Sequence, residues 1–193
     1  MQDLTPPPAA LAPPSPWLLR WQRHFAPGQT ALDLACGSGR HVRWLRAQGL
    51  QVCAVDRDAL ALEGLRDCGA ERIEADLEGA PWPLGDRHFD LVLVTNYLWR
   101  PLLPRIVEAV APGGWLIYET FAEGHQRIGR PSRPDFLLRP GELLAAAAGL
   151  RIVAYEDGFV DGDGAAVNPR QIQRVAAVRE RTPGDLQARY HLT

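Results

Sequence analysis

The sequence predicts an α/β fold, a three-layer sandwich in which helices cover both faces of a seven-stranded, mostly parallel sheet. Short apolar runs alternate with amphipathic segments between residues 31 and 178, and such alternation builds parallel sheets through βαβ crossovers. The run at residues 91–95 is apolar almost throughout, as expected of a strand covered on both faces. Composition does not change along the chain, and its 193 residues suit a single domain.

The N-terminal segment, residues 1–14, is proline-rich, and we expect it to be extended and flexible. Six prolines fall within the first 16 residues, which disfavours a helix at the start. Ser15 followed by Pro16 is typical of a helix start, with serine as the N-cap and proline at the first helical position. A helix is therefore predicted over about residues 16–25, at the beginning of a single domain that covers residues 15–193.

Two tryptophans on this predicted helix, Trp17 and Trp21, lie one turn apart and form an aromatic ridge. The ridge has two interpretations at this point. It either closes over a ligand pocket as a cover or packs on the sheet as ordinary core.

The remaining elements follow in order. Strands are predicted at 31–35, 51–55, 72–75, 91–95, 115–119, 152–155 and 171–178. Helices are predicted at 40–48, after the N-cap Asp58, at 101–110 and at 141–148, and a turn-rich segment, 157–169, joins the last two strands. Ligands of such sheets bind beyond the carboxyl ends of the strands, so the residues that end the strands are the candidates for a site.

Bulk composition is that of an ordinary globular domain, with 46% hydrophobic and 23% charged residues. The formal charge of −2 gives no general reason to expect a nucleic-acid partner, although a local basic patch leaves one open. Three cysteines without CxxC spacing indicate buried free thiols. With no signal peptide and no apolar run of about 18 residues, we expect a cytoplasmic protein that has no membrane partner. Nothing fixes an oligomeric state.

The first predicted strand runs into a glycine-rich turn, Ala35-Cys36-Gly37-Ser38-Gly39. Gly37 and Gly39 remove two side chains where the chain turns sharply and approaches a ligand. The second strand ends in Asp56, which is well placed to accept hydrogen bonds from ribose hydroxyls. The third ends at Asp76, placed to accept from an adenine amine. These features predict a site for a nucleoside-bearing cofactor.

Two kinds of cofactor use this layout, and the residues favour one of them. A dinucleotide site takes GxGxxG, whereas here Val42 stands where the third glycine would be. Asp33 lies four residues before Gly37, and its carboxylate suits the cationic methionyl end of S-adenosylmethionine better than a pyrophosphate. A nicotinamide-dependent oxidoreductase is therefore the weakest of the alternatives.

On these motifs the chain resembles the class I, Rossmann-like, S-adenosylmethionine-dependent methyltransferases. The matching segments are DLACGSGR at 33–40, AVDRD at 54–58, EADLE at 74–78, FDLVLVTNYL at 89–98 and APGGWLIYET at 111–120. Its small size makes it similar to the compact tellurite-resistance-type members. The resemblance implies the strand order 3-2-1-4-5-7-6 with strand seven antiparallel, and S-adenosyl-L-methionine as the cofactor.

The resemblance also implies which residues hold the cofactor. Gly37 and Gly39 would line the methionyl moiety, Asp56 would hold the ribose, and Arg57 or Leu77 would pack on adenine. Asn96 and Tyr97 would lie beside the sulfonium. The whole expected cofactor set is Asp33, Ala35, Gly37, Ser38, Gly39, His41, Asp56, Arg57, Asp76, Leu77, Asn96 and Tyr97. No metal site is expected.

The sequence shows no obvious catalytic base, and a methyl transfer to a good nucleophile needs only alignment and exclusion of water. The candidates are His125, Tyr97 and Glu119. Thr95-Asn96-Tyr97-Leu98 also departs from the Asn/Asp-Pro-Pro-Tyr/Phe signature of many adenine-amino methyltransferases.

An arginine-rich loop, 124–139, follows the fifth predicted strand. Its arginines either form a cationic lid for an anionic substrate or are solvated and tie the loop to the body.

Three functions remain open on the sequence. The first is methyl transfer to a small-molecule acceptor, because no recognition domain is appended and the net charge is slightly acidic. The second is an RNA or ribosome-associated methyltransferase, which only the loop arginines favour. The third is a non-catalytic protein that binds the cofactor.

Overall fold

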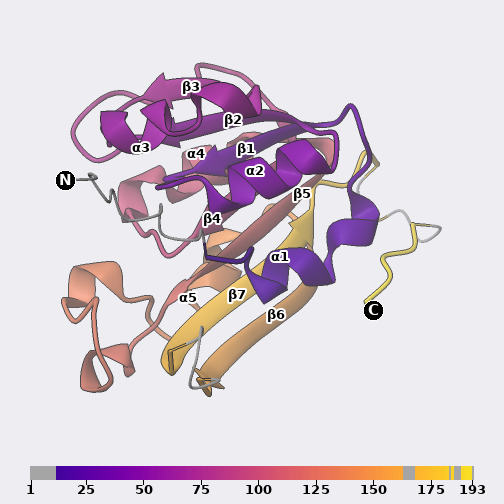
Figure 1. Ribbon diagram of the computed structural model, residues 1–193. Coiled ribbons are helices and arrows are strands. Elements are labelled where there is room, and N and C mark those ends of the chain that lie inside the picture. The colour runs from indigo at the N-terminus through magenta and orange to yellow at the C-terminus, as the bar shows by residue number, and fades with distance from the viewer. Residues whose placement is uncertain (1–11, 163–167, 183, 185–187, 193) are drawn as a thin grey trace, which may run out of the picture.

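A computed structural model describes residues 12–162, 168–182, 184 and 188–192 of the chain. These residues form one seven-stranded sheet of order β3-β2-β1-β4-β5-β7-β6 (Figure 1). The five strands from β3 to β5 are parallel, and β7 runs antiparallel to both of its neighbours. The fold class, the strand order and the direction of strand seven are as predicted.

The strands are β1 (Thr30–Leu34), β2 (Gln51–Asp56), β3 (Glu71–Glu74), β4 (Phe89–Thr95), β5 (Val110–Phe121), β6 (Arg151–Val160) and β7 (Arg170–Val178). The α-helices are α1 (Pro16–Arg20), α2 (Arg40–Ala47), α3 (Ala59–Glu63), α4 (Leu103–Glu108) and α5 (Glu142–Ala146). Short 3₁₀ turns are η1 (Gln22–His24), η2 (Arg66–Cys68), η3 (Arg100–Leu102), η4 (His125–Arg127) and η5 (Pro134–Phe136).

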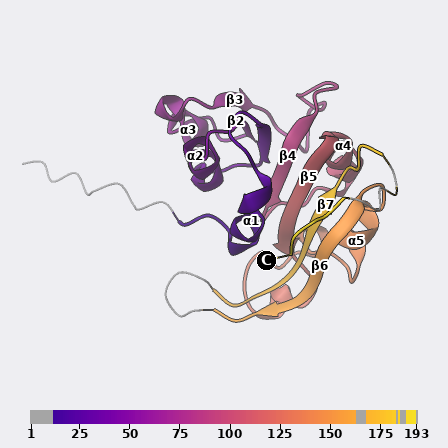
Figure 2. The same cartoon turned by 90° about the vertical axis from the view of Figure 1, so that its right-hand side faces the viewer.

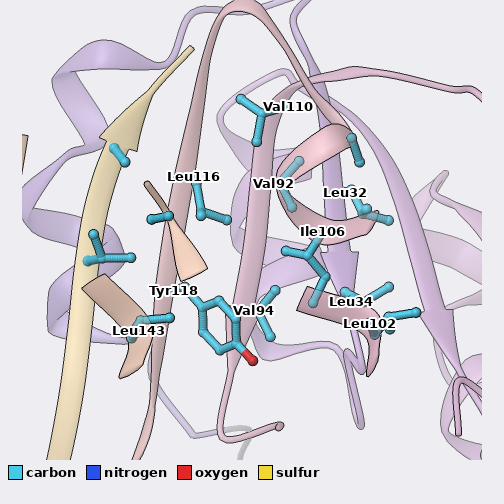
Figure 3. Close-up of a cluster of buried hydrophobic side chains, with 14 of the residues drawn as sticks. Leu32, Leu34, Val92, Val94, Leu102, Ile106, Val110, Leu116, Tyr118 and Leu143 are labelled. Carbon is cyan, nitrogen blue, oxygen red and sulfur yellow. The ribbon is translucent and has the colours of Figure 1, made fainter. Parts of the chain in front are cut away.

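Helices cover both faces of the sheet, and each face has its own apolar cluster. Figure 2 shows α1, α2 and α3 on one side of the sheet and α4 and α5 on the other. On the α4 side, Leu32, Val92 and Leu116 point from three neighbouring strands toward Ile106 of α4 (Figure 3). Burial of apolar side chains on both faces explains why the central strands are apolar without alternation.

The boundaries around Val110 differ from the prediction. The helix predicted at 101–110 is divided into η3 and the short α4, and β5 begins at Val110. The segment Pro112-Gly113-Gly114 does not form a turn that ends the preceding helix. Instead the Gly113 N–H donates to the Arg179 carbonyl at 2.6 Å, and Arg179 N–H donates to the Gly114 carbonyl at 3.0 Å. Pairing with the chain that leaves β7 therefore keeps this glycine-rich stretch extended.

The predicted N-terminal helix is present but short, because α1 ends at Arg20 and η1 follows it. Ser15 is its N-cap and accepts a hydrogen bond from Trp17 N–H, with Pro16 at the first helical position, as expected. Both tryptophans are buried: Trp17 Nε1 donates to the Val175 carbonyl of β7 at 3.1 Å. The ridge packs on the sheet.

Among the described residues, no helix is long and apolar enough to cross a membrane. Cys36, Cys53 and Cys68 are free thiols; the first two are buried and Cys68 is half-buried.

Candidate functional site

The loop after β1 turns on residues with left-handed backbone. Ala35, Gly37 and Gly39 have φ angles of 55°, 53° and 75°. A Cβ on Gly39 would lie 2.3 Å from the Cδ2 of Leu65, whereas a Cβ on Gly37 would meet nothing within 4 Å. Gly39 is thus required for packing beneath the loop, and Gly37 leaves one side of the loop open.

A cavity of about 150 Å³ lies beyond the carboxyl ends of β1, β2, β3 and β4. It is lined by Ala35, Asp56, Arg57, Ala75, Asp76, Leu77, Glu78 and Tyr97. We call it the smaller cavity. Six residues of the expected cofactor set therefore meet in one place, although they come from four segments of the chain.

The carboxylates of the smaller cavity are positioned by backbone donors. Asp56 Oδ2 accepts from Gly37 N–H at 2.7 Å, and its Oδ1 accepts from Asp58 N–H at 3.0 Å. Asp76 Oδ1 accepts from Glu78 N–H at 3.0 Å. The contact between Asp56 and Gly37 ties the end of β2 to the glycine-rich loop.

Tyr97 and Asn96 follow β4. The Tyr97 hydroxyl is buried with no hydrogen-bond partner among the described residues, and burial raises the pKa of this phenol. Its backbone is fixed, because the Tyr118 hydroxyl donates to the Tyr97 carbonyl at 2.9 Å. Asn96 has a φ of 55° and is exposed, and its N–H donates to the Glu119 carbonyl at 3.0 Å. Ser38 is also exposed and does not line the cavity.

Asp33 is fully buried below the loop, and its Oδ2 has no hydrogen-bond partner among the described residues. Burial, opposed by the charge of Arg40, raises the pKa of Asp33 to about 7. His41 Nδ1 lies 3.9 Å from Asp33 Oδ2, while His41 Nε2 accepts from Ser15 N–H at 3.2 Å. Burial lowers the pKa of His41 to about 3, so the ring is neutral and carries its proton on Nδ1, facing Asp33.

Glu119, at the end of β5, is also fully buried. Its Oε1 accepts from the Ser15 hydroxyl, and its Oε2 has no hydrogen-bond partner among the described residues. Two arginines of β7 flank it, with Arg170 4.0 Å from Oε1 and Arg174 3.9 Å from Oε2. Ser15 therefore joins the start of α1 to both His41 and Glu119. No local sequence pattern signals this contact, since its partners are far apart in the chain.

His125 is buried in the loop after β5, and both of its ring nitrogens have partners. Nδ1 accepts from Gln171 N–H at 3.4 Å, and Nε2 lies 3.0 Å from the Arg130 carbonyl, to which it donates. The ring also packs on Phe121, with 4.4 Å between centroids. These contacts hold the loop to β7.

A second, larger cavity of about 760 Å³ lies beside the N-terminal strap, residues 12–15. Its walls are the strap, α1, Arg40, the loop around His125 and the start of β7. The strap is held by Arg40, whose Nη1 donates to the Pro13 carbonyl at 3.3 Å. The loop between Ala35 and Arg40 borders both cavities, because Ala35 lines the smaller and Arg40 the larger.

Arg100, which follows β4 in the chain, fixes the arginine-rich loop. This side chain pairs with Glu142 at 2.6 Å and donates to the Asp135 and Leu137 carbonyls at 2.8 and 2.7 Å. Of the loop's own arginines, Arg133 pairs with Asp135 at 3.0 Å, and Arg130 lines the larger cavity. Part of the loop's charge is therefore structural. The described residues contain no group of His, Cys, Asp or Glu that could hold a metal ion.

Comparison with known proteins agrees with this arrangement. Residues 32–118 match the family model described as a methyltransferase domain. The chain is similar to the ribosomal protein L11 methyltransferases of Burkholderia mallei and Burkholderia vietnamiensis, with 37% identity over 103 residues in each case. Each match covers 51% of this chain and 33% of the relative, so the chain spans about a third of the length of these curated relatives.

Solved structures of similar fold include a TehB-like SAM-dependent methyltransferase from Corynebacterium glutamicum, with a TM-score of 0.62 and 19% identity over 85% of this chain and 87% of that one. TehB from Haemophilus influenzae has a TM-score of 0.67 and 17% identity over 84% of this chain and 61% of that one. At these identities the likeness shows the fold.

Residues 32–118 therefore match a methyltransferase domain, and the sheet order is that of the solved S-adenosylmethionine-dependent methyltransferases. The fold expected from the sequence is confirmed, and the family match agrees with the class and the cofactor that the resemblance implies.

Proposed function

We propose that the chain transfers a methyl group from S-adenosylmethionine, held in the smaller cavity and along the glycine-rich loop, to a small molecule in the larger cavity. The observation that carries this proposal is the position of the loop between Ala35 and Arg40, which borders both cavities. A donor held along it can therefore face an acceptor.

The residues present fit this cofactor. Asp33 offers a buried carboxylate oxygen that has no hydrogen-bond partner in the described part of the chain, which suits a cationic amino group held directly or through the loop backbone. The open side of Gly37 leaves room for a ligand against the backbone. Asp56 and Asp76 supply acceptors for ribose hydroxyls and an adenine amine, and Leu77 supplies an apolar face. Asn96 and Tyr97 lie next along the same edge.

In this proposal the chain acts by alignment. When bound, S-adenosylmethionine supplies a methyl group on a sulfonium, so that the lone pair of an acceptor atom forms the new bond while the carbon–sulfur electron pair stays on sulfur. The backbone between Ala35 and Gly39 fixes the donor side, and the strap and α1 shield the acceptor side from water. Such positioning is worth several kcal/mol of the barrier.

A general base is not part of the proposal. The ring nitrogens of His125 are both engaged, and Glu119 is enclosed by Ser15 and two arginines. Tyr97 lines the smaller cavity and has a raised pKa, so at neutral pH it is a hydrogen-bond donor. We propose that Tyr97 orients the bound donor, and that an acceptor proton leaves to solvent.

Calorimetry with S-adenosylhomocysteine, together with NADH as a matched dinucleotide, tests the donor site. We expect S-adenosylhomocysteine to bind with one site per chain and NADH not to bind. The variant Asp56→Asn should weaken S-adenosylhomocysteine by about tenfold or more, since one good hydrogen bond to a charged group is worth about 1.5–3 kcal/mol. Binding of NADH alone would sink the proposal and restore the oxidoreductase alternative.

A ribosome-associated acceptor is the second candidate, and the relatives named for ribosomal protein L11 favour it. The exposed Arg127 and Arg139 of the loop would then meet RNA or a ribosomal surface. Steep loss of binding to ribosomal RNA with added salt would support this candidate, because phosphate contacts release counterions.

A further inference from the structure

The larger cavity is charged with one sign. Its ionisable lining residues are Arg40, His125, Arg130 and Arg170, and among the described residues that line it none is acidic. The nearest buried carboxylate described above, Glu119, lies behind this surface and is shared by Arg170 and Arg174. Arg174 is already paired with Glu156, its Nε donating at 2.6 Å. Because Arg174 is paired with Glu156, Glu119 is left to face Arg170.

Arg170 has an unfilled donor among the described residues. Its side chain is only 16% exposed, and its Nε is buried without a hydrogen-bond partner among the described residues. Among the described residues its carboxylate partner is Glu119, whose Oε1 is 4.0 Å away, beyond the 2.7–2.9 Å that is usual for a charge-assisted hydrogen bond. A buried guanidinium with an unfilled donor is costly unless an anion completes it.

Arg40 stands on the same wall and has little compensation of its own. Its Nη1 bonds only to the neutral Pro13 carbonyl among its described hydrogen bonds. Burial and the like charge of Arg170 lower the pKa of Arg40, opposed by the charge of Glu119. Arg40 and Arg170 line the same cavity, and two like-charged guanidinium groups in one cavity suit a carboxylate or phosphate.

Several other residues that line the larger cavity are apolar. Leu19 of α1, Phe121 at the end of β5 and Ile128 of the loop line it, together with the prolines of the strap. Ile128 is 42% exposed, although it is a large aliphatic side chain. A ligand that fills this space has an apolar body.

We propose that Arg40 and Arg170 form a binding site for the acid group of the methyl acceptor, and that the acceptor is a small organic anion with an apolar body. This inference rests on the proposed methyl transfer to a small molecule. The carboxylate of bound S-adenosylmethionine is the other anionic group that suits these arginines, and the experiment distinguishes it from the acid group of the acceptor.

Calorimetry on the full chain saturated with S-adenosylhomocysteine supplies the test, with phenylacetate as the probe and phenylacetamide as its neutral match. We expect phenylacetate to bind at least ten times more tightly than phenylacetamide. Arg170→Gln should lose about tenfold or more of the phenylacetate affinity and leave S-adenosylhomocysteine affinity unchanged. Arg127→Gln, in the loop next to the cavity but outside its lining, is the control and should bind both as the wild type does.

Other outcomes overturn the inference in distinguishable ways. Equal binding of the acid and the amide would remove the anion site. A parallel loss of S-adenosylhomocysteine affinity in Arg170→Gln would assign the arginines to the donor's carboxylate instead. If Arg170→Gln does not fold, Arg170→Lys replaces it as a variant that keeps the charge. Unchanged phenylacetate affinity in Arg40→Gln would then contradict a site shared by the two arginines. Failure of S-adenosylhomocysteine to bind the wild type would instead reject the donor site itself.

Discussion

At the scale of single residues, Gly37 and Gly39 have similar backbone angles but different surroundings. Both have positive φ, yet only a side chain at Gly39 would collide, with Leu65. The two glycines therefore have separable roles, one in packing and one in leaving a side of the loop open, where we propose that the donor binds.

We predict that Gly39→Ala lowers the free energy of unfolding by on the order of 2–4 kcal/mol, from left-handed strain and the clash together. Gly37→Ala should cost only about 1 kcal/mol but weaken S-adenosylhomocysteine at least tenfold, because its methyl group enters the open side of the loop. Urea unfolding and calorimetry measure the two effects. If Gly37→Ala bound the probe like the wild type, that open side would not face the donor.

Asp33 gives a pH-dependent prediction. Because its pKa is raised from 3.8 to about 7, the folded protein holds this proton more tightly than the unfolded chain does. Ionisation of this carboxyl therefore lowers the free energy of unfolding as the pH rises from about 4 to 7, and the full loss is reached above pH 7. Asn cannot ionise, so Asp33→Asn should gain on the order of 2–4 kcal/mol relative to the wild type between pH 4 and pH 8.

Urea unfolding of the wild type and of Asp33→Asn at pH 4, 6 and 8 measures this gain as the difference between their free energies of unfolding. The titration of other groups cancels in that difference. A difference that stays constant over this range would show that Asp33 titrates normally. The same variant should bind S-adenosylhomocysteine less tightly at pH 8, since the buried charge is then missing.

Residues at strand ends were predictable from the sequence, and buried polar contacts between distant segments were not. Asp56, Asp76, Leu77 and Tyr97 line one cavity because a parallel sheet gathers its carboxyl ends at one edge. By contrast, Glu119 was expected only as one of three catalytic candidates. Its bond to Ser15 depends on how α1 packs over the sheet.

At the scale of elements, the docking of α1 depends on its first residue. Ser15 caps the helix, donates to Glu119 and presents its N–H to His41. We predict that Ser15→Ala lowers the free energy of unfolding by on the order of 2–3 kcal/mol, since a cap and a bond to a buried carboxylate are lost together.

Ser132→Ala, at an exposed serine of the loop, is the control and should change stability by less than about 0.5 kcal/mol. Urea unfolding compares the two variants. Equal effects would mean that the start of α1 does not support the fold.

Periodicity located every strand but misplaced some ends. The glycines after Pro112 were expected to end an element, because turn chemistry is local. Their pairing with Arg179, beyond β7, is a tertiary contact that no local pattern contains. Likewise β6 extends to Val160, into the segment expected to be turns, because β7 pairs with it along that length.

At the scale of the whole molecule, the sheet has a rigid centre and a lightly covered edge. Strands β1 and β4 have partners on both sides and buried side chains on both faces, whereas β3 is an edge strand with mostly exposed side chains. We predict that amide hydrogens of β1 and β4 exchange about 100-fold or more slowly than those of β3, because β3 opens without global unfolding. Hydrogen exchange followed by mass spectrometry measures this; uniform protection across the sheet would contradict it.

The two cavities differ in the part of the chain that supplies them. Every residue lining the smaller cavity lies within 32–118, the segment that matches the methyltransferase family, while Arg40 is the sole contribution of that segment to the larger cavity among the described residues. The walls of the larger cavity come from before and after it. If the proposed function holds, changes in the flanking segments would alter the acceptor cavity and leave the lining of the donor cavity unchanged.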